Sequence, residues 1–135
     1  MLGNYKTYRK LASLKMYLQK NFSTSLKVGY FDSPNFGDAL NPILLKLLGV
    51  KHVSHIATEF YRKENMMCIG SVLQVANDEC IVLGSGFISK DSVFLYGAPT
   101  NILGVRGLLT KQKLSEMNVS CPEVYGDPAL LLPGL

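Results

Sequence analysis

The sequence has few cysteines, only two histidines and no long apolar run, and each shortage excludes a class of protein. The three cysteines, at positions 68, 80 and 121, are too far apart for a zinc knuckle, and an odd number does not suit a disulfide framework. No apolar run approaches the ~20 residues that a membrane span requires. Charged residues interrupt every candidate core of an N-terminal secretory signal. We therefore expect a cytoplasmic protein that holds no metal.

Acidic residues are absent from the first 30 positions, which contain six of the 14 basic residues. The remaining residues carry eight bases and ten acids, so the body of the chain is not a basic surface for nucleic acid. Residues 1–25 are expected to form a basic amphipathic helix. In one interpretation this helix covers the domain and keeps its lysines in water. In the other it makes peripheral contact with the anionic inner face of the cell membrane.

Apolar runs of strand length alternate with segments of helical apolar spacing along the rest of the chain. The pattern predicts strands near 26–31, 66–69, 81–83 and 101–105, and helices near 5–20, 38–48 and 110–117. The polar connection 52–65 is expected to hold a short strand or turn in its middle. This alternation predicts an α/β domain over residues 26–135, with a Rossmann-like, mainly parallel sheet and flanking helices.

The segment Asn35–Asp38 lies between a predicted strand and a predicted helix, where open α/β sheets place ligand contacts. Gly37 allows a ligand to approach the backbone. A carboxylate at this point would repel a phosphate, so we expect Asp38 to cap the helix or to hold a sugar hydroxyl. Pro42 suits the first turn of a helix, which makes Asn41 an alternative cap.

Small residues follow two further predicted strands, at Gly70-Ser71 and at Gly84-Ser85-Gly86. The second group lacks the third small position of a dinucleotide-binding fingerprint. Taken alone, each group is also explained by a tight turn. On consecutive strands of one sheet, however, the two groups would line the same edge and leave room for a bound molecule.

Arg106 lies between a predicted strand and a predicted helix, so its guanidinium is expected at the carboxyl end of the strand. The planar fork of arginine suits a carboxylate or a phosphate. A salt bridge to Asp127 or Asp38 is the alternative. Thr110 is expected to cap the following helix. Asp127 lies in a Gly-Asp-Pro turn that Asx-turn chemistry alone would explain.

Five motifs together resemble one family. They are N-F-G-D-A-L-N at 35–41, I-G-S at 69–71, G-S-G at 84–86, V-R-G-L-L-T at 105–110 and G-D-P-A-L-L-L-P at 126–133. Their order is similar to that in the polysaccharide pyruvyl transferases, over residues 27–133. The resemblance implies transfer of a pyruvyl group from phosphoenolpyruvate to a sugar of a bacterial surface polysaccharide, as a ketal. It also implies the N-terminal domain of a two-domain, glycosyltransferase-B-type fold, with the second domain absent from this chain.

By this resemblance, Arg106 is expected to hold the donor's carboxylate or phosphate, and Asp38 to act on the acceptor hydroxyl. No cofactor is implied beyond phosphoenolpyruvate as a substrate. The implied partners are a saccharide or lipid-linked glycan and a second-domain polypeptide. Two alternatives stay open: a non-catalytic Rossmann-like binding protein in polysaccharide assembly, and a fragment of a nucleotide-sugar glycosyltransferase. The expected substrate-binding residues are Asn35, Gly37, Asn41, Gly70, Ser71, Gly84, Ser85, Gly86 and Asp127.

Overall fold

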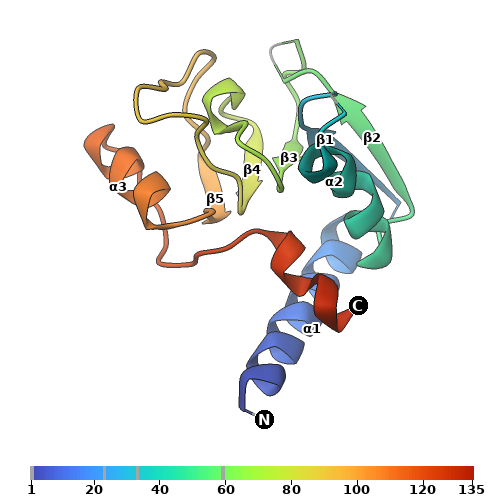
Figure 1. The fold of residues 1–135 in the computed structure, drawn as a ribbon. Helices are drawn as coiled ribbons and strands as arrows, with labels where there is room; N and C mark the ends of the chain where they lie inside the picture. Colours follow the sequence, from blue (N-terminus) through green and yellow to red (C-terminus); the bar gives the residue numbers. More distant parts are fainter. Residues whose placement is uncertain (1, 23, 33, 59) are drawn as a thin grey trace.

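The computed structural model of this chain is built around one five-stranded sheet. It describes residues 2–22, 24–32, 34–58 and 60–135. All strand pairs are parallel, in the order β2-β1-β3-β4-β5 (Figure 1). The α/β prediction with a parallel sheet is confirmed. The strands are β1 (Ser25–Gly29), β2 (His52–Ile56), β3 (Asn65–Met67), β4 (Cys80–Leu83) and β5 (Asn101–Gly104).

Helices flank this sheet. Figure 1 shows α3 beyond β5 at one end of the molecule, and the C-terminal η2 beside α1. Two of the five helical segments are short 3₁₀-helices, η1 and η2. The segment between β4 and β5 contains neither helix nor strand and returns across the top of the sheet. The helical segments are α1 (Leu2–Phe22), α2 (Phe36–Leu47), η1 (Leu73–Val75), α3 (Leu108–Glu116) and η2 (Pro128–Gly134).

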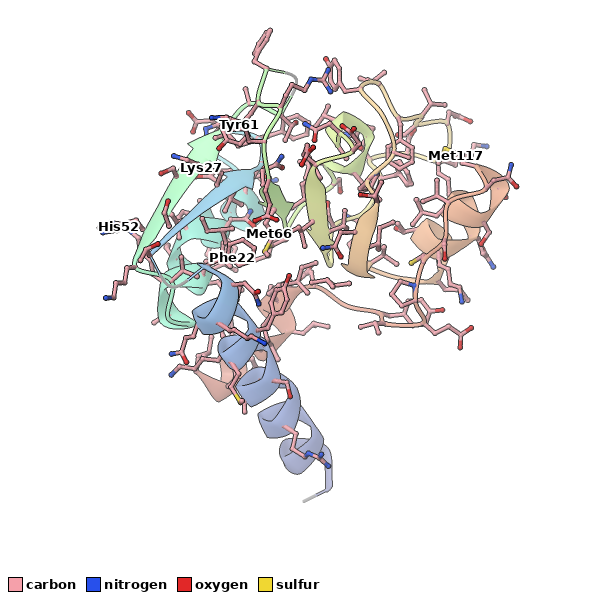
Figure 2. All side chains as sticks on the ribbon, turned by 180° about the vertical axis from the view of Figure 1, so that it is seen from behind. Phe22, Lys27, His52, Tyr61, Met66 and Met117 are labelled. Carbon is pink, nitrogen blue, oxygen red and sulfur yellow. The ribbon has the colours of Figure 1, made fainter. Side chains whose placement is uncertain are left out.

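The middle of the sheet is buried on both faces, so its strands read as continuous apolar runs. Side chains alternate between two core clusters. Met66 and Ile81 belong to the cluster under α1, α2 and η2, whereas Met67 and Val82 belong to the cluster under η1 and α3. Figure 2 shows Met66 surrounded by side chains in the middle of the sheet.

The N-terminal helix α1 contributes to the first of these clusters. Leu11, Leu18 and Phe22 are buried there, and η2 packs against the same helix. This packing agrees with the interpretation in which the helix covers the domain. Within the part of the chain that the structure describes, no helix has the length and apolarity to cross a membrane.

The outer strand β2 lies at the start of the connection 52–65. The middle of the connection contains a turn, one of the two predicted alternatives, in which the Ala57 carbonyl accepts from the N–H groups of Phe60 and Tyr61 at 3.1 Å. An edge strand is half exposed and therefore tolerates polar side chains, which conceals it among loop residues. His52 and His55 are exposed here. Figure 2 shows His52 at the side of the sheet away from Met117 of α3.

Helix α2 begins earlier than predicted and continues through a proline. Its N-cap is Asn35, whose Oδ1 accepts from the Gly37 N–H at 2.8 Å, so neither Asp38 nor Asn41 is the cap. Pro42 has no N–H for the carbonyl of Asp38, four positions earlier. The amide Nδ2 of Asn41 donates to that carbonyl at 3.0 Å. The side chain thus replaces the missing bond, and the helix does not end there.

Helix α3 also starts earlier than predicted. Its N-cap is Gly107, which forms no side-chain cap, so the expectation that Thr110 caps this helix is wrong. Thr110 is instead buried in the first turn.

Candidate functional site

The strand order places the predicted motifs at one edge of the sheet. β1 pairs with β2 on one side and with β3 on the other, so the order of strands reverses between β1 and β3. Open α/β sheets bind ligands outside the carboxyl ends of the strands at such a point. The loop that begins α2 follows β1, Gly70-Ser71 follows β3, Gly84–Gly86 follows β4, and Arg106 follows β5. The four segments are therefore neighbours in this order.

Arg106 is fixed by two contacts at this edge and stays exposed. Its Nη1 donates to Ser71 Oγ at 2.5 Å, and its Nη2 donates to the Phe87 carbonyl at 2.9 Å. The guanidinium has five N–H donors in one plane. Two contacts therefore orient the fork without using all its donors, and an anion can approach from solvent.

Gly86 provides the surface on which this guanidinium rests. A Cβ at Gly86 would lie 2.8 Å from Cζ, Nε and Nη2 of Arg106. The absence of a side chain therefore permits the approach of the guanidinium to the backbone, and at Gly86 Arg106 fills the space that was predicted for a bound molecule.

The loops after β3, β4 and β5 are joined by backbone and hydroxyl bonds. Both Ser85 Oγ and the Gly86 N–H donate to the Gly70 carbonyl, at 3.0 and 3.2 Å. The Arg106 N–H donates to the Ser85 carbonyl at 3.2 Å. The buried Ser85 thus connects three loops, so the edge is a rigid platform for the guanidinium.

Asp38 and Asn41 join the start of α2 to the segment after β3. Asn41 is fully buried; its Oδ1 accepts from the Ile69 N–H at 2.9 Å, and its Nδ2 donates to the Ile69 carbonyl at 2.9 Å. Asp38 is 7% exposed, and its Oδ1 lies 3.0 Å from the place where Gly70 would carry a Cβ. The carboxylate of Asp38 therefore faces the backbone of the β3 loop, beside the point where strand order reverses.

Asp127 has a structural contact at the other side of the edge. Its Oδ1 accepts from the Ala129 N–H at 2.8 Å and caps η2. Gly84 has φ +98° and would place a Cβ 2.5 Å from the Asp127 Cα, so only glycine fits there.

Between described residues, the structure has an ion pair for Lys111 with Glu123 and none for Arg106. Arg106 therefore does not form the salt bridge to Asp127 or Asp38 that was the alternative prediction.

Two polar contacts of this site were missed at the level of sequence. The Phe87 carbonyl is a backbone group and leaves no sequence signal. Gln74 donates from Nε2 to the Ser71 carbonyl at 2.9 Å, and its Oε1 accepts from the Ile88 N–H at 3.3 Å. A buried glutamine in an otherwise apolar segment was the available signal.

Tyr30, Phe31 and Asp32 follow β1 directly and line a pocket of about 230 Å³ together with residues after β2. An aromatic pair and a carboxylate at the end of a predicted strand were a usable signal that the sequence analysis passed over. Burial, and the nearby carboxylates of Asp32 and Asp38, raise the pKa of the Tyr30 phenol. Tyr30 therefore remains a hydrogen-bond donor at neutral pH.

Among the described residues, this edge contains neither a reactive thiol nor a cluster of metal ligands. Burial raises the pKa of the Cys68 thiol to about 12, which keeps it protonated and unreactive. Among the described residues, no three His, Cys, Asp or Glu side chains gather closely enough to hold a metal ion.

Comparisons with protein-family models, with curated proteins and with solved structures give no match to this chain.

Proposed function

We propose that this chain is the N-terminal half of an enzyme of the polysaccharide pyruvyl transferase type, which transfers a pyruvyl group from phosphoenolpyruvate to a sugar. The observation that carries the proposal is the exposed guanidinium of Arg106, seated on Gly86 and held by Ser71 at the carboxyl edge. The order of the five motifs, described above, gives the reaction class.

Phosphoenolpyruvate suits this arrangement because it is small and carries two anionic groups. The fork of Arg106 binds one of them through paired N–H donors. Gly86 lets the guanidinium lie close to the backbone, and Gly70 adds no side chain beside it, so the donor can reach the exposed fork from solvent. The second anionic group requires a further cation, which we assign to the second-domain polypeptide.

The reaction requires, in this half of the site, a group that accepts the hydrogen of the acceptor hydroxyl and a cation that stabilises the charge of the donor. A sugar hydroxyl adds through oxygen to C2 of phosphoenolpyruvate, while C3 receives a proton and becomes a methyl group. A second hydroxyl of the same sugar then displaces phosphate from C2 and closes the ketal, and its proton passes to a base. Asp38 accepts the hydrogen of the attacking hydroxyl, and Arg106 stabilises the negative charge of the donor.

The donor is a cytoplasmic metabolite, so we place the protein in the cytoplasm. The basic residues of α1 would allow peripheral contact with the inner face of the membrane, where a lipid-linked glycan is presented.

Calorimetric titration of phosphoenolpyruvate tests the proposal. A charge-assisted hydrogen bond contributes about 1.5–3 kcal/mol, so Arg106→Ala should weaken binding by at least about tenfold. Arg106→Lys should recover only part of the affinity, because lysine has no planar fork. Lys20→Ala removes an exposed positive charge from the last turn of α1, outside the lining of the pockets, and serves as the control. Equal affinities for wild type and Arg106→Ala, or an equal loss in Lys20→Ala, would contradict the proposal.

A further inference from the structure

A concave site lies at the carboxyl ends of β1 and β2, beside the edge described above. Its volume is about 230 Å³, and its lining includes Tyr30, Phe31, Asp32, His55, Thr58 and Tyr96. Pockets for drug-sized ligands measure roughly 300–1,000 Å³. This pocket therefore suits a single small ring better than a dinucleotide.

Exposed aromatic side chains dominate the rim of this pocket. Phe31 is 41% exposed and Tyr96 is 36% exposed. Asp32, which also lines the pocket, is exposed and supplies a carboxylate. His55 Nε2 lies 2.7 Å from the Tyr30 carbonyl and donates to it, because a carbonyl only accepts. The neutral ring then keeps Nδ1 as an acceptor.

The charges around the pocket select a neutral ligand. Arg62 lies over the Tyr96 ring, 5.9 Å from its centroid, and donates to the Tyr96 carbonyl at 3.2 Å. Arg62 is not in the pocket lining, but a cation at the Tyr96 ring would be repelled by its guanidinium, and an anion would be repelled by the carboxylate of Asp32. A pyranose sugar avoids both penalties. Its C–H face packs on aromatic rings, and its hydroxyls pair with carboxylate, phenol and imidazole groups.

Tyr30 connects this pocket to the proposed catalytic edge. The carboxylates of Asp32, in the pocket, and Asp38, at the start of α2, both act on its phenol. Strands in a sheet are spaced about 4.8 Å apart. Arg106 contacts Ser71 in the loop after β3, and β3 is the direct neighbour of β1. The pocket and the guanidinium therefore lie along one edge of the sheet, at the carboxyl ends of neighbouring strands.

We infer that this pocket binds one pyranose ring of the acceptor and directs its hydroxyls toward Asp38 and the donor held by Arg106. The inference rests on the proposed function and adds the acceptor subsite to it. Phe31 and Tyr96 are assigned to the packing of the ring, and Asp32 to its hydroxyls.

Nuclear magnetic resonance titration tests this subsite on the full chain. The probes are the methyl glycosides of glucose, galactose, mannose and N-acetylglucosamine, each added to ¹⁵N-labelled protein. At least one glycoside should shift the amide signals of residues 30–32, 55–58 and 96. Phe31→Ala and Tyr96→Ala should each weaken that binding roughly two- to tenfold, the range of one aromatic contact. Phe60→Ala is the matched control, because Phe60 is an 85% exposed aromatic side chain outside the pocket lining.

The outcomes separate the subsite from the proposed function. No shift with any glycoside, shifts outside the pocket lining, or an unchanged affinity in both Phe31→Ala and Tyr96→Ala would overturn the subsite. A parallel titration with phosphoenolpyruvate reports on Arg106 alone. Binding of phosphoenolpyruvate without binding of any glycoside rejects the pocket and retains the donor site. Binding of a glycoside at the pocket without binding of phosphoenolpyruvate rejects the transferase and retains a sugar-binding site.

Discussion

Arg106 donates from Nη1 to the hydroxyl of Ser71 at 2.5 Å, across 35 positions of the chain. The contact spans the loops of β5 and β3, with the loop of β4 between them. It holds an exposed guanidinium over a surface of glycine and serine residues.

Gly86→Ala should impair phosphoenolpyruvate binding almost as much as Arg106→Ala. The added Cβ would lie 2.8 Å from three atoms of the guanidinium, so the fork must move away from its place. The melting temperature should change little, because the displaced atoms are the end of a flexible side chain. Calorimetry and a thermal melt measure the two effects.

Gly107→Ala is the matched control for this change. A Cβ at Gly107 meets no atom within 4 Å, and its φ of −172° is extended backbone that alanine adopts freely. Donor affinity should stay at the wild-type value. A similar loss of affinity in both variants would show that the contact between Gly86 and the guanidinium has no specific role in donor binding.

Asn41→Leu should lower the free energy of unfolding by about 3 kcal/mol, because it removes three buried hydrogen bonds to backbone groups of Ile69 and Asp38. Urea denaturation measures the change. Asn21→Ala, which removes one exposed hydrogen bond to Tyr17, should shift the value by no more than about 0.5 kcal/mol. Equal effects of the two substitutions would contradict the role assigned to Asn41.

Stability should fall at alkaline pH through Cys68. Its pKa rises from 9.0 to about 12 in the folded state, so the folded chain retains a proton that the unfolded chain releases. The contribution is complete below pH 9 and is lost between pH 9 and 12, by up to about 1.4 kcal/mol per pH unit. Urea denaturation at pH 8 and pH 10 should therefore show a smaller decrease for Cys68→Ala than for wild type. Parallel decreases in the two proteins would argue against a buried Cys68 thiol.

Phe31→Ala should weaken the binding of a methyl glycoside without changing the affinity for phosphoenolpyruvate, because Phe31 lines the pocket beside β1 and not the seat of Arg106. The paired titrations described above measure both affinities on one preparation. Loss of both ligands in this variant would mean that the two sites are one.

Much of this fold was predictable because buried parallel strands carry their signal locally. The runs at β3 and β4 are apolar on both faces, and each ends before small residues. The edge strand β2 lacks that signal because its exposed positions are polar. The start of α2 was misplaced because Pro42 suggested a new helix, whereas Asn41 supplies the bond that the proline lacks.

Individual residues of the candidate site could be predicted from the sequence, but the contacts between them could not. The positions of Arg106 and Gly86 after strands indicated the carboxyl edge. The pairing of Arg106 with Ser71 depends on strand order, which is set by tertiary packing and is not encoded in any one motif. The sequence around Tyr30 and His55 also did not predict that their rings lie side by side, with centroids 4.4 Å apart.

The central claim, that Arg106 binds the donor at this edge, is tested most directly by mapping phosphoenolpyruvate onto the amide spectrum of the ¹⁵N-labelled chain. We predict that the signals of Ser71, Gly86 and Arg106 shift in a saturable manner and that Arg106→Ala abolishes these shifts. Saturable shifts that persist in Arg106→Ala, or that lie only around Arg9 of α1, would contradict the account.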